Sequence, residues 1–93
     1  MDEHEKVLMT QVGRNVERLR AERGMSLDQL AGASSVGRQE IERLVRAEGH
    51  LLVDDLFLLA GALRVAPEAL LNGIDWIPDE DGGGGEYRLE GSD

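Results

Sequence analysis

The first part of the chain carries an apolar stripe at helical spacing. The stripe consists of Val7, Leu8, Val12, Val16 and Leu19. Residues three or four positions apart lie on one face of a helix, so the stripe predicts an amphipathic helix. Gly24 interrupts the pattern, as glycine commonly does just after the last turn of a helix. We therefore expect a helix over residues 5 to 23.

Two shorter apolar stripes follow and predict two short helices. Ser26 opens the first, because its hydroxyl and the Gln29 side chain can each bind a free backbone N–H in a capping box. This helix is expected to end near Ala33, and Gly37 is expected to cap the second, which extends to about residue 46. The inward positions are Leu27, Leu30 and Ala31 in the first helix and Ile41, Leu44 and Val45 in the second. Two short helices crossing at a tight corner are the plan of a helix-turn-helix motif.

The helical pattern continues to Asn72-Gly73, where we expect it to stop. A fourth helix is expected over about Val53 to Leu63, and a short fifth helix begins beside Pro67. The expected buried positions are Leu56, Leu59, Ala60 and Leu63 in the fourth helix and Leu70 and Leu71 in the fifth. The fold class predicted is all-α, a five-helix domain.

After residue 73 the period of the pattern changes from helical spacing to strand-like alternation. The two alternating segments are residues 74–77 and 86–89, separated by Pro78, three acidic residues and four glycines. One interpretation is a short C-terminal β-hairpin that pairs Trp76 with Tyr87 and forms dimer contacts. The candidate contacts are Ile74, Trp76, Tyr87 and Leu89. The other interpretation is an extended, mobile acidic tail.

The length of 93 residues allows one compact core and a short appendage. We divide the chain into an N-terminal extension of the first helix (1–12), the helical domain (13–73, with the motif at about 27–46) and the acidic Gly-rich tail (74–93). Cysteine is absent, and His4 and His50 have no metal-ligand spacing, so we expect no metal and no cofactor.

The sequence offers no catalytic constellation and no membrane segment. No His converges with Ser and Asp, and the Gly82–Gly85 run lacks the sequence context of a phosphate-binding loop, so we expect no enzyme activity. No run of about 18 apolar residues exists to cross a bilayer, and the acidic N-terminus is unlike a signal peptide. We therefore expect a cytoplasmic protein without a membrane partner.

Charge is distributed unevenly along the chain, whose formal net charge is −9. Residues 13–47 hold seven arginines against five acidic residues, a net of +2, whereas residues 51–93 hold two arginines against ten, a net of −8. Phosphate contacts need Lys or Arg. The stretch 13–47, which contains the predicted motif, is thus mildly basic, although the whole chain is acidic.

Two stretches carry a resemblance to a known family. They are Gly13 to Ala31 (GRNVERLRAERGMSLDQLA) and Leu56 to Leu71 (LFLLAGALRVAPEALL). Residues 13–73 resemble the Cro/C1-type (Xre-like) helix-turn-helix family of DNA-binding transcriptional regulators. The resemblance implies a Cro/C1 repressor-like domain whose second motif helix enters the major groove.

The resemblance implies that base contacts come from the first two turns of that helix. The implied base-reading residues are Arg38, Gln39, Glu42 and Arg43. Arg suits a guanine edge, Gln an adenine, and Glu can accept from a cytosine amino group. The implied phosphate contacts are Ser26, Gln29, Arg14 and Arg46, with the first backbone turn at Ser26. The alternative interpretation is a solvated surface in which Glu42 forms weak ion pairs with Arg38 or Arg46.

Three positions depart from the family pattern. Ser35 stands at the corner where glycine is usual, so a strained or looser turn is expected. Val45 stands where a glutamate commonly pairs with the first helix, so Arg20 is left to contact Glu17 or Glu48 or to stay free for phosphate. The loop over residues 47–55, commonly basic in the family, is acidic and should add little to DNA affinity.

The function predicted is a sequence-specific transcriptional regulator, a repressor that binds double-stranded DNA as a homodimer on a two-fold operator. The alternative is a protein-binding module, antitoxin-like or a regulatory partner, that uses the same fold without strong DNA binding. Net acidity and the two glutamates Glu40 and Glu42 favour this alternative, and the acidic tail is its candidate site for a protein partner.

Overall fold

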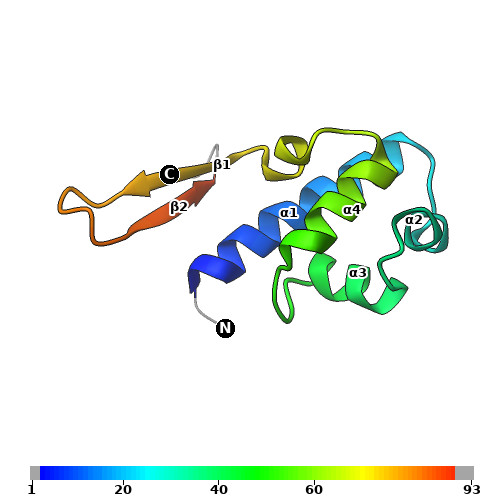
Figure 1. Ribbon diagram of the computed structural model, residues 1–93, viewed down its shortest axis with the longest axis horizontal. Helices are drawn as coiled ribbons and strands as arrows, with labels where there is room; N and C mark the ends of the chain where they lie inside the picture. The colour runs from blue at the N-terminus through cyan, green and yellow to red at the C-terminus, as the bar shows by residue number, and fades with distance from the viewer. Residues whose placement is uncertain (1–2, 90–93) are drawn as a thin grey trace.

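The computed structural model describes residues 3–89, which form a helical body with a hairpin at one end (Figure 1). The α-helices are α1 (Glu3–Glu22), α2 (Leu27–Ser34), α3 (Arg38–Val45) and α4 (Val53–Leu63). A 3₁₀-helix, η1 (Pro67–Leu71), and the strands β1 (Ile74–Pro78) and β2 (Gly85–Leu89) complete the chain. The expected bounds of α2, α3 and α4 agree with these within one residue, whereas α1 begins two residues earlier and ends one earlier than expected.

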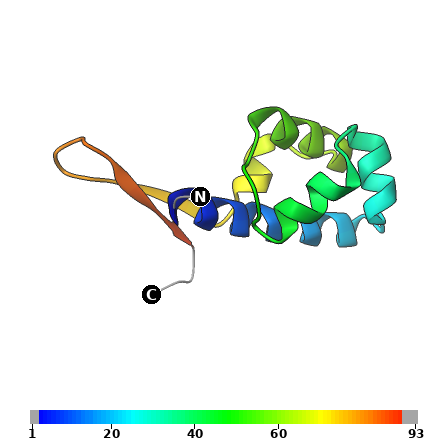
Figure 2. The same cartoon turned by 90° about the horizontal axis from the view of Figure 1, so that it is seen from below.

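The core lies where α1 crosses the other helices. Figure 2 shows α2, α3, α4 and the η1 segment arranged in a ring. The side chains of the core fill the centre of this ring. The buried apolar residues are Met9, Val12, Val16, Leu19, Leu30, Val36, Ile41, Leu44, Leu59, Ala60, Leu63 and Leu70. These buried residues are aliphatic apart from Met9, and none of them is aromatic.

Helices α1 and α3 cross very closely at Gly13. A Cβ added at Gly13 would lie 2.8 Å from the Leu44 carbonyl oxygen and 3.0 Å from the Val45 Cα. Real Cβ atoms do not approach backbone so closely, so glycine is needed for this crossing. The crossing sets the position of α3 on the helical body.

The fifth helix differs from the expectation. In the described part of the chain there are four α-helices, and the segment beside Pro67 is a five-residue 3₁₀-helix. Side chains of α1 bind the backbone carbonyl group of Asn72, the residue just after this 3₁₀-helix. Gln11 Nε2 and Asn15 Nδ2 donate to its oxygen at 3.1 and 2.9 Å. Of the two leucines expected to close the core, Leu70 is buried but Leu71 is exposed, because a short 3₁₀ turn presents only one of them inward. Leu56 in α4 is likewise only half-buried.

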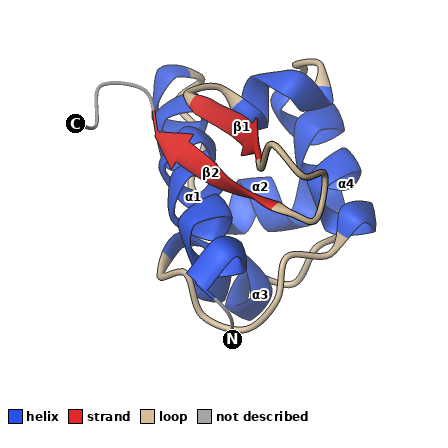
Figure 3. Cartoon of the chain, turned by 90° about the vertical axis from the view of Figure 1, so that its left-hand side faces the viewer, coloured by secondary structure: helices blue, strands red, loops and turns tan. Residues whose placement is uncertain are grey.

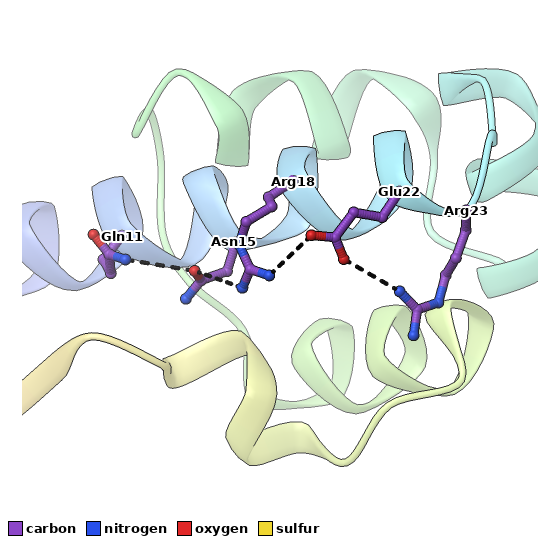
Figure 4. A network of polar contacts seen from close by, with 5 residues as sticks. All are labelled: Gln11, Asn15, Arg18, Glu22 and Arg23. Atoms are coloured by element: carbon purple, nitrogen blue, oxygen red, sulfur yellow. Dashed lines mark hydrogen bonds and ion pairs between the residues drawn. The ribbon is translucent and has the colours of Figure 1, made fainter.

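A row of polar side chains on α1 faces this segment (Figure 4). Asn15 is 3 % exposed, and its Nδ2 also donates to the Leu70 carbonyl oxygen at 2.8 Å. Its Oδ1 accepts from Gln11 Nε2 and from Arg18 Nη2, both at 3.4 Å. Arg18 in turn forms an ion pair with Glu22 at 3.5 Å. This row ties the C-terminal part of the helical domain to α1.

The C-terminal segment is a β-hairpin rather than an extended tail. Its antiparallel register pairs Trp76 with Tyr87 as expected, and their ring centroids lie 5.0 Å apart. His4 of α1 meets both rings edge-on at 6.4 Å. The hairpin lies across the N-terminal part of α1 (Figure 3) and extends beyond the helical body, so that the molecule measures 44 × 23 × 20 Å. The last four residues of the predicted tail lie outside the described residues.

Candidate nucleic-acid interface

The corner between α2 and α3 is built by three residues, Ser35 to Gly37. Ser35 adopts the left-handed conformation (φ 65°), and its N–H donates to the Ala31 carbonyl oxygen at 3.0 Å. The Val36 N–H donates to Ser34 Oγ at 3.1 Å, and the Val36 side chain is buried in the core. Ser35 thus adopts the left-handed conformation that glycine usually takes at this corner, and the turn is tight rather than loose.

The N-terminus of α2 carries the predicted capping box. The Gln29 N–H donates to Ser26 Oγ at 3.0 Å, and the Ser26 N–H donates to Gln29 Oε1 at 2.8 Å. These bonds occupy the oxygen of the Gln29 amide and hold its side chain over the first turn. The Gln29 Nε2 group remains on the exposed surface as a donor.

Helix α3 buries one stripe and exposes another. Ile41 and Leu44 are buried, so the helix is held by its apolar side. We call the polar side chains of its first two turns the recognition face: Arg38, Gln39, Glu42 and Arg43. Three of these are exposed and Glu42 is half-buried. The sequence-predicted base-reading residues therefore lie together on one outward surface.

Ion pairs hold three of the four residues of the recognition face. Arg38 Nη1 donates to Asp28 Oδ1 of α2 at 2.8 Å, and Arg38 Nε donates to Glu42 Oε1 at 3.1 Å. The hydrogen bond to Asp28, followed by that to Glu42, raises the pKa of Arg38 above its ordinary value. Arg43 Nη1 donates to Glu40 Oε1 at 3.1 Å. The predicted pairing of Glu42 with Arg38 is confirmed.

Other donors around the recognition face are unpaired. Within residues 3–89, Gln39, Arg14 and Arg46 form no side-chain hydrogen bond or ion pair, so the alternative pairing of Glu42 with Arg46 does not occur. Arg46 and Glu42 line a small depression of about 190 Å³ together with Leu27 from the first turn of α2. Arg14 is exposed on α1, directly after the close crossing at Gly13.

Arg20 is not free for phosphate. Its Nη2 contacts Glu17 Oε2 at 2.6 Å, and its Nη1 donates to the Met25 carbonyl oxygen at 2.6 Å. Of the two partners considered for Arg20, the structure selects Glu17 and not Glu48. The Arg20 Nε atom is buried without a partner. Arg20 therefore braces the link between α1 and α2.

Asp28 is the residue of this surface that sequence reasoning missed. It lies ten positions before Arg38, and helical spacing links no such pair. The available signal was an acidic residue in the first turn of α2, opposite a basic residue in the first turn of α3. Around the motif, Asp28, Glu40 and Glu42 balance Arg38, Arg43 and Arg46, so this surface is electrically close to neutral.

The described residues contain neither a candidate metal site nor a membrane-spanning helix. Residues 3–89 contain no group of three or more His, Cys, Asp or Glu side chains arranged to hold a metal ion. No helix in the same range is long and apolar enough to cross a membrane.

A capped α2, a tight corner and an outward polar face on α3 define a helix-turn-helix protein of the DNA-binding type. The family model HTH_3, described as helix-turn-helix, matches residues 16–70. The chain belongs to this family of Cro/C1-type transcriptional regulators.

Solved structures support the same class. The restriction-modification controller protein C.AhdI from Aeromonas hydrophila is 26% identical with a TM-score of 0.64, over 67% of this chain and 94% of that one. The controller protein C.Esp1396I is 27% identical with a TM-score of 0.63, over 68% of this chain and 82% of that one. The clp gene regulator ClgR from C. glutamicum is 26% identical with a TM-score of 0.64, over 69% and 83%. No curated protein sequence matches the chain.

Proposed function

We propose that this protein is a sequence-specific repressor that binds a two-fold DNA operator as a homodimer, with α3 in the major groove. The observation that carries the proposal is the recognition face, held outward by the buried side of α3 and by the tight corner. We propose that the bound dimer acts by occluding a promoter. We also propose a cytoplasmic location, because the protein would meet its DNA partner there.

Each side chain has a distinct role in this proposal. The base-reading residues are Arg38, Gln39, Glu42 and Arg43, and the phosphate contacts are Ser26, Gln29, Arg14 and Arg46. Gln29 supports its role by keeping Nε2 as an outward donor beside the first-turn backbone of α2. The unpaired state of Gln39 and Arg46 supports theirs, because neither must break an ion pair to reach DNA.

The comparisons support a DNA partner and assembly. One structure of C.Esp1396I is a tetramer in complex with its natural 35 base-pair operator, and this chain is 27% identical to it with a TM-score of 0.62. Dimers of such motifs bind half-sites one helical turn apart. We therefore expect two copies of α3 to meet successive major grooves.

The test begins with selection of bound fragments from random DNA, followed by replacement of Arg38 and Gln39 with Ala. Each good base contact contributes about 1–3 kcal/mol of discrimination, so affinity for the selected site should fall at least about tenfold. The matched control is Arg88→Ala, which removes one positive charge from the hairpin. Unchanged affinity and sequence preference in the double variant would remove both residues from the reading role.

A second candidate function is a protein-binding module that retains this fold. The near-neutral motif surface and the acidic hairpin favour it, because phosphate contacts depend on unpaired cations. Binding to bulk genomic DNA separates the two candidates. A regulator should bind at low salt and lose affinity steeply as salt is added, whereas a protein-binding module should show no binding even at low salt.

A further inference from the structure

Arg38 occupies an unusual position, because carboxylates from two helices hold it at once. Asp28 of α2 accepts from its Nη1 at 2.8 Å, and Glu42 of α3 accepts from its Nε at 3.1 Å. One cation is thus surrounded by two anions, and two of its three nitrogens are engaged. The side chains of Arg38 and Asp28 are nevertheless 52 % and 73 % exposed. The group therefore lies where DNA is proposed to approach.

These contacts change what Arg38 can bind. A free guanidinium pairs with any phosphate that comes near it, regardless of sequence. Here the group as a whole carries a net negative charge, so phosphate gains little from approaching it. A guanine edge offers two acceptors in a fixed geometry, and a bidentate contact with it can replace a carboxylate contact. Arg38 is therefore withheld from phosphate more strongly than from a correctly placed base.

We propose that Asp28 is a specificity-determining residue that acts through Arg38: its carboxylate holds the guanidinium across the corner and suppresses binding to non-operator DNA. This inference rests on the proposed function. Asp28 is a positioning residue and makes no base contact itself. Glu42 assists from within α3, whereas Asp28 ties Arg38 to the neighbouring helix and so fixes the direction of the guanidinium relative to the whole motif.

Stability alone gives no reason for this contact. Exposed ion pairs contribute little to folding. Among residues 3–89, the Asp28 side chain forms no hydrogen bond or ion pair other than that with Arg38, so the isosteric Asp28→Asn variant should remain folded. A change in DNA binding by this variant would therefore report on recognition rather than on the fold.

The experiment measures the affinity of wild type and Asp28→Asn for the selected operator and for a random-sequence duplex, over a series of salt concentrations. We expect random-duplex affinity to rise about fivefold at about 0.1 M salt, as for one gained phosphate contact, and its salt slope to steepen by about one. Operator affinity should change less than about twofold, so the specificity ratio should fall about fivefold. The matched control, Asp75→Asn on β1, removes the same charge at the other end of the molecule and should leave the ratio unchanged (Figure 1).

A second pair of variants tests whether Asp28 acts through Arg38. In an Arg38→Ala background, Asp28→Asn should raise random-duplex affinity by less than about twofold, because no guanidinium is released. A full fivefold rise in that background would mean that Asp28 repels phosphate directly, and would overturn the inference. An unchanged specificity ratio in Asp28→Asn would overturn it too, while sequence-selective binding by the wild type would leave the proposed function standing. Absence of DNA binding by the wild type would overturn both.

Discussion

At the scale of single residues, the most informative side chain outside the recognition face is Asn15. It interrupts the apolar stripe of α1 between Val12 and Leu19, and it is 3 % exposed. Its Nδ2 donates to two carbonyl oxygens at 2.8 and 2.9 Å. These hydrogen bonds hold the C-terminal end of η1 against α1. A polar residue in the middle of an apolar stripe is a signal that could have been read from the sequence, because buried amides are almost always hydrogen-bonded.

Replacement of Asn15 tests this role. Asn15→Ala should lower the free energy of unfolding by about 1–3 kcal/mol, because the Leu70 carbonyl oxygen loses its side-chain donor. Urea denaturation followed by circular dichroism measures the change. Gln11→Ala is the control, since its bond to the same segment is exposed and its loss should matter less. Equal effects of the two variants would show that burial of Asn15 contributes nothing special.

At the scale of elements, the corner between α2 and α3 combines a secure geometry with a strained residue. Ser35 has φ 65° and is exposed, and the buried Val36 that follows it fixes the path of the chain. An L-residue in the left-handed region is disfavoured by about 1–2 kcal/mol relative to glycine. The corner therefore depends on packing around it to maintain this conformation.

Ser35→Gly should stabilise the protein. Relief of the strain, reduced by the greater freedom of glycine in the unfolded chain, leaves an expected gain of about 0.5–1 kcal/mol. Thermal unfolding measures it, with Ser26→Gly as a comparison that removes the capping box and should not stabilise. A lower melting temperature for Ser35→Gly would mean that the serine side chain makes a contribution larger than the strain.

At the scale of the whole molecule, the acidic part and the motif lie at opposite ends. The hairpin, residues 74–89, holds five acidic residues against one arginine and projects away from α2 along the 44 Å axis (Figure 1). Charges in about 0.1 M salt are screened over about 10 Å. The net charge of −9 therefore weakens DNA binding less than its size suggests, since the motif itself is close to neutral.

The hairpin is also where we expect self-association. Trp76 is 50 % exposed and Ile77 38 %, so the hairpin presents two large apolar side chains that a second copy could cover. Removal of residues 74–93 should convert a dimer to a monomer in light scattering, and Trp76→Ala should weaken the dimer while keeping the chain length. Circular dichroism serves as the control for folding, because Ile74 packs against the core. An unchanged mass after truncation would contradict the dimer role.

Much of this protein could be predicted from local signals. The capping box at Ser26, the cap at Gly37 and the bounds of α4 depend on residues within four positions of one another. The grouping of the recognition face follows from the same helical period. The pairing of Trp76 with Tyr87 agrees with one of the two interpretations of the alternating segments, whereas the choice between a hairpin and an extended tail was left open by the sequence.

What the sequence by itself determined is therefore the helices, their caps and the outward set of polar side chains. The tertiary structure alone decided the contact of α1 side chains with the end of η1 and the contact of Asp28 with Arg38. Both outcomes join residues of different elements that packing brings together. Sequence spacing carries no information about such approaches, because the angle and distance between helices are set by how the whole core fits together.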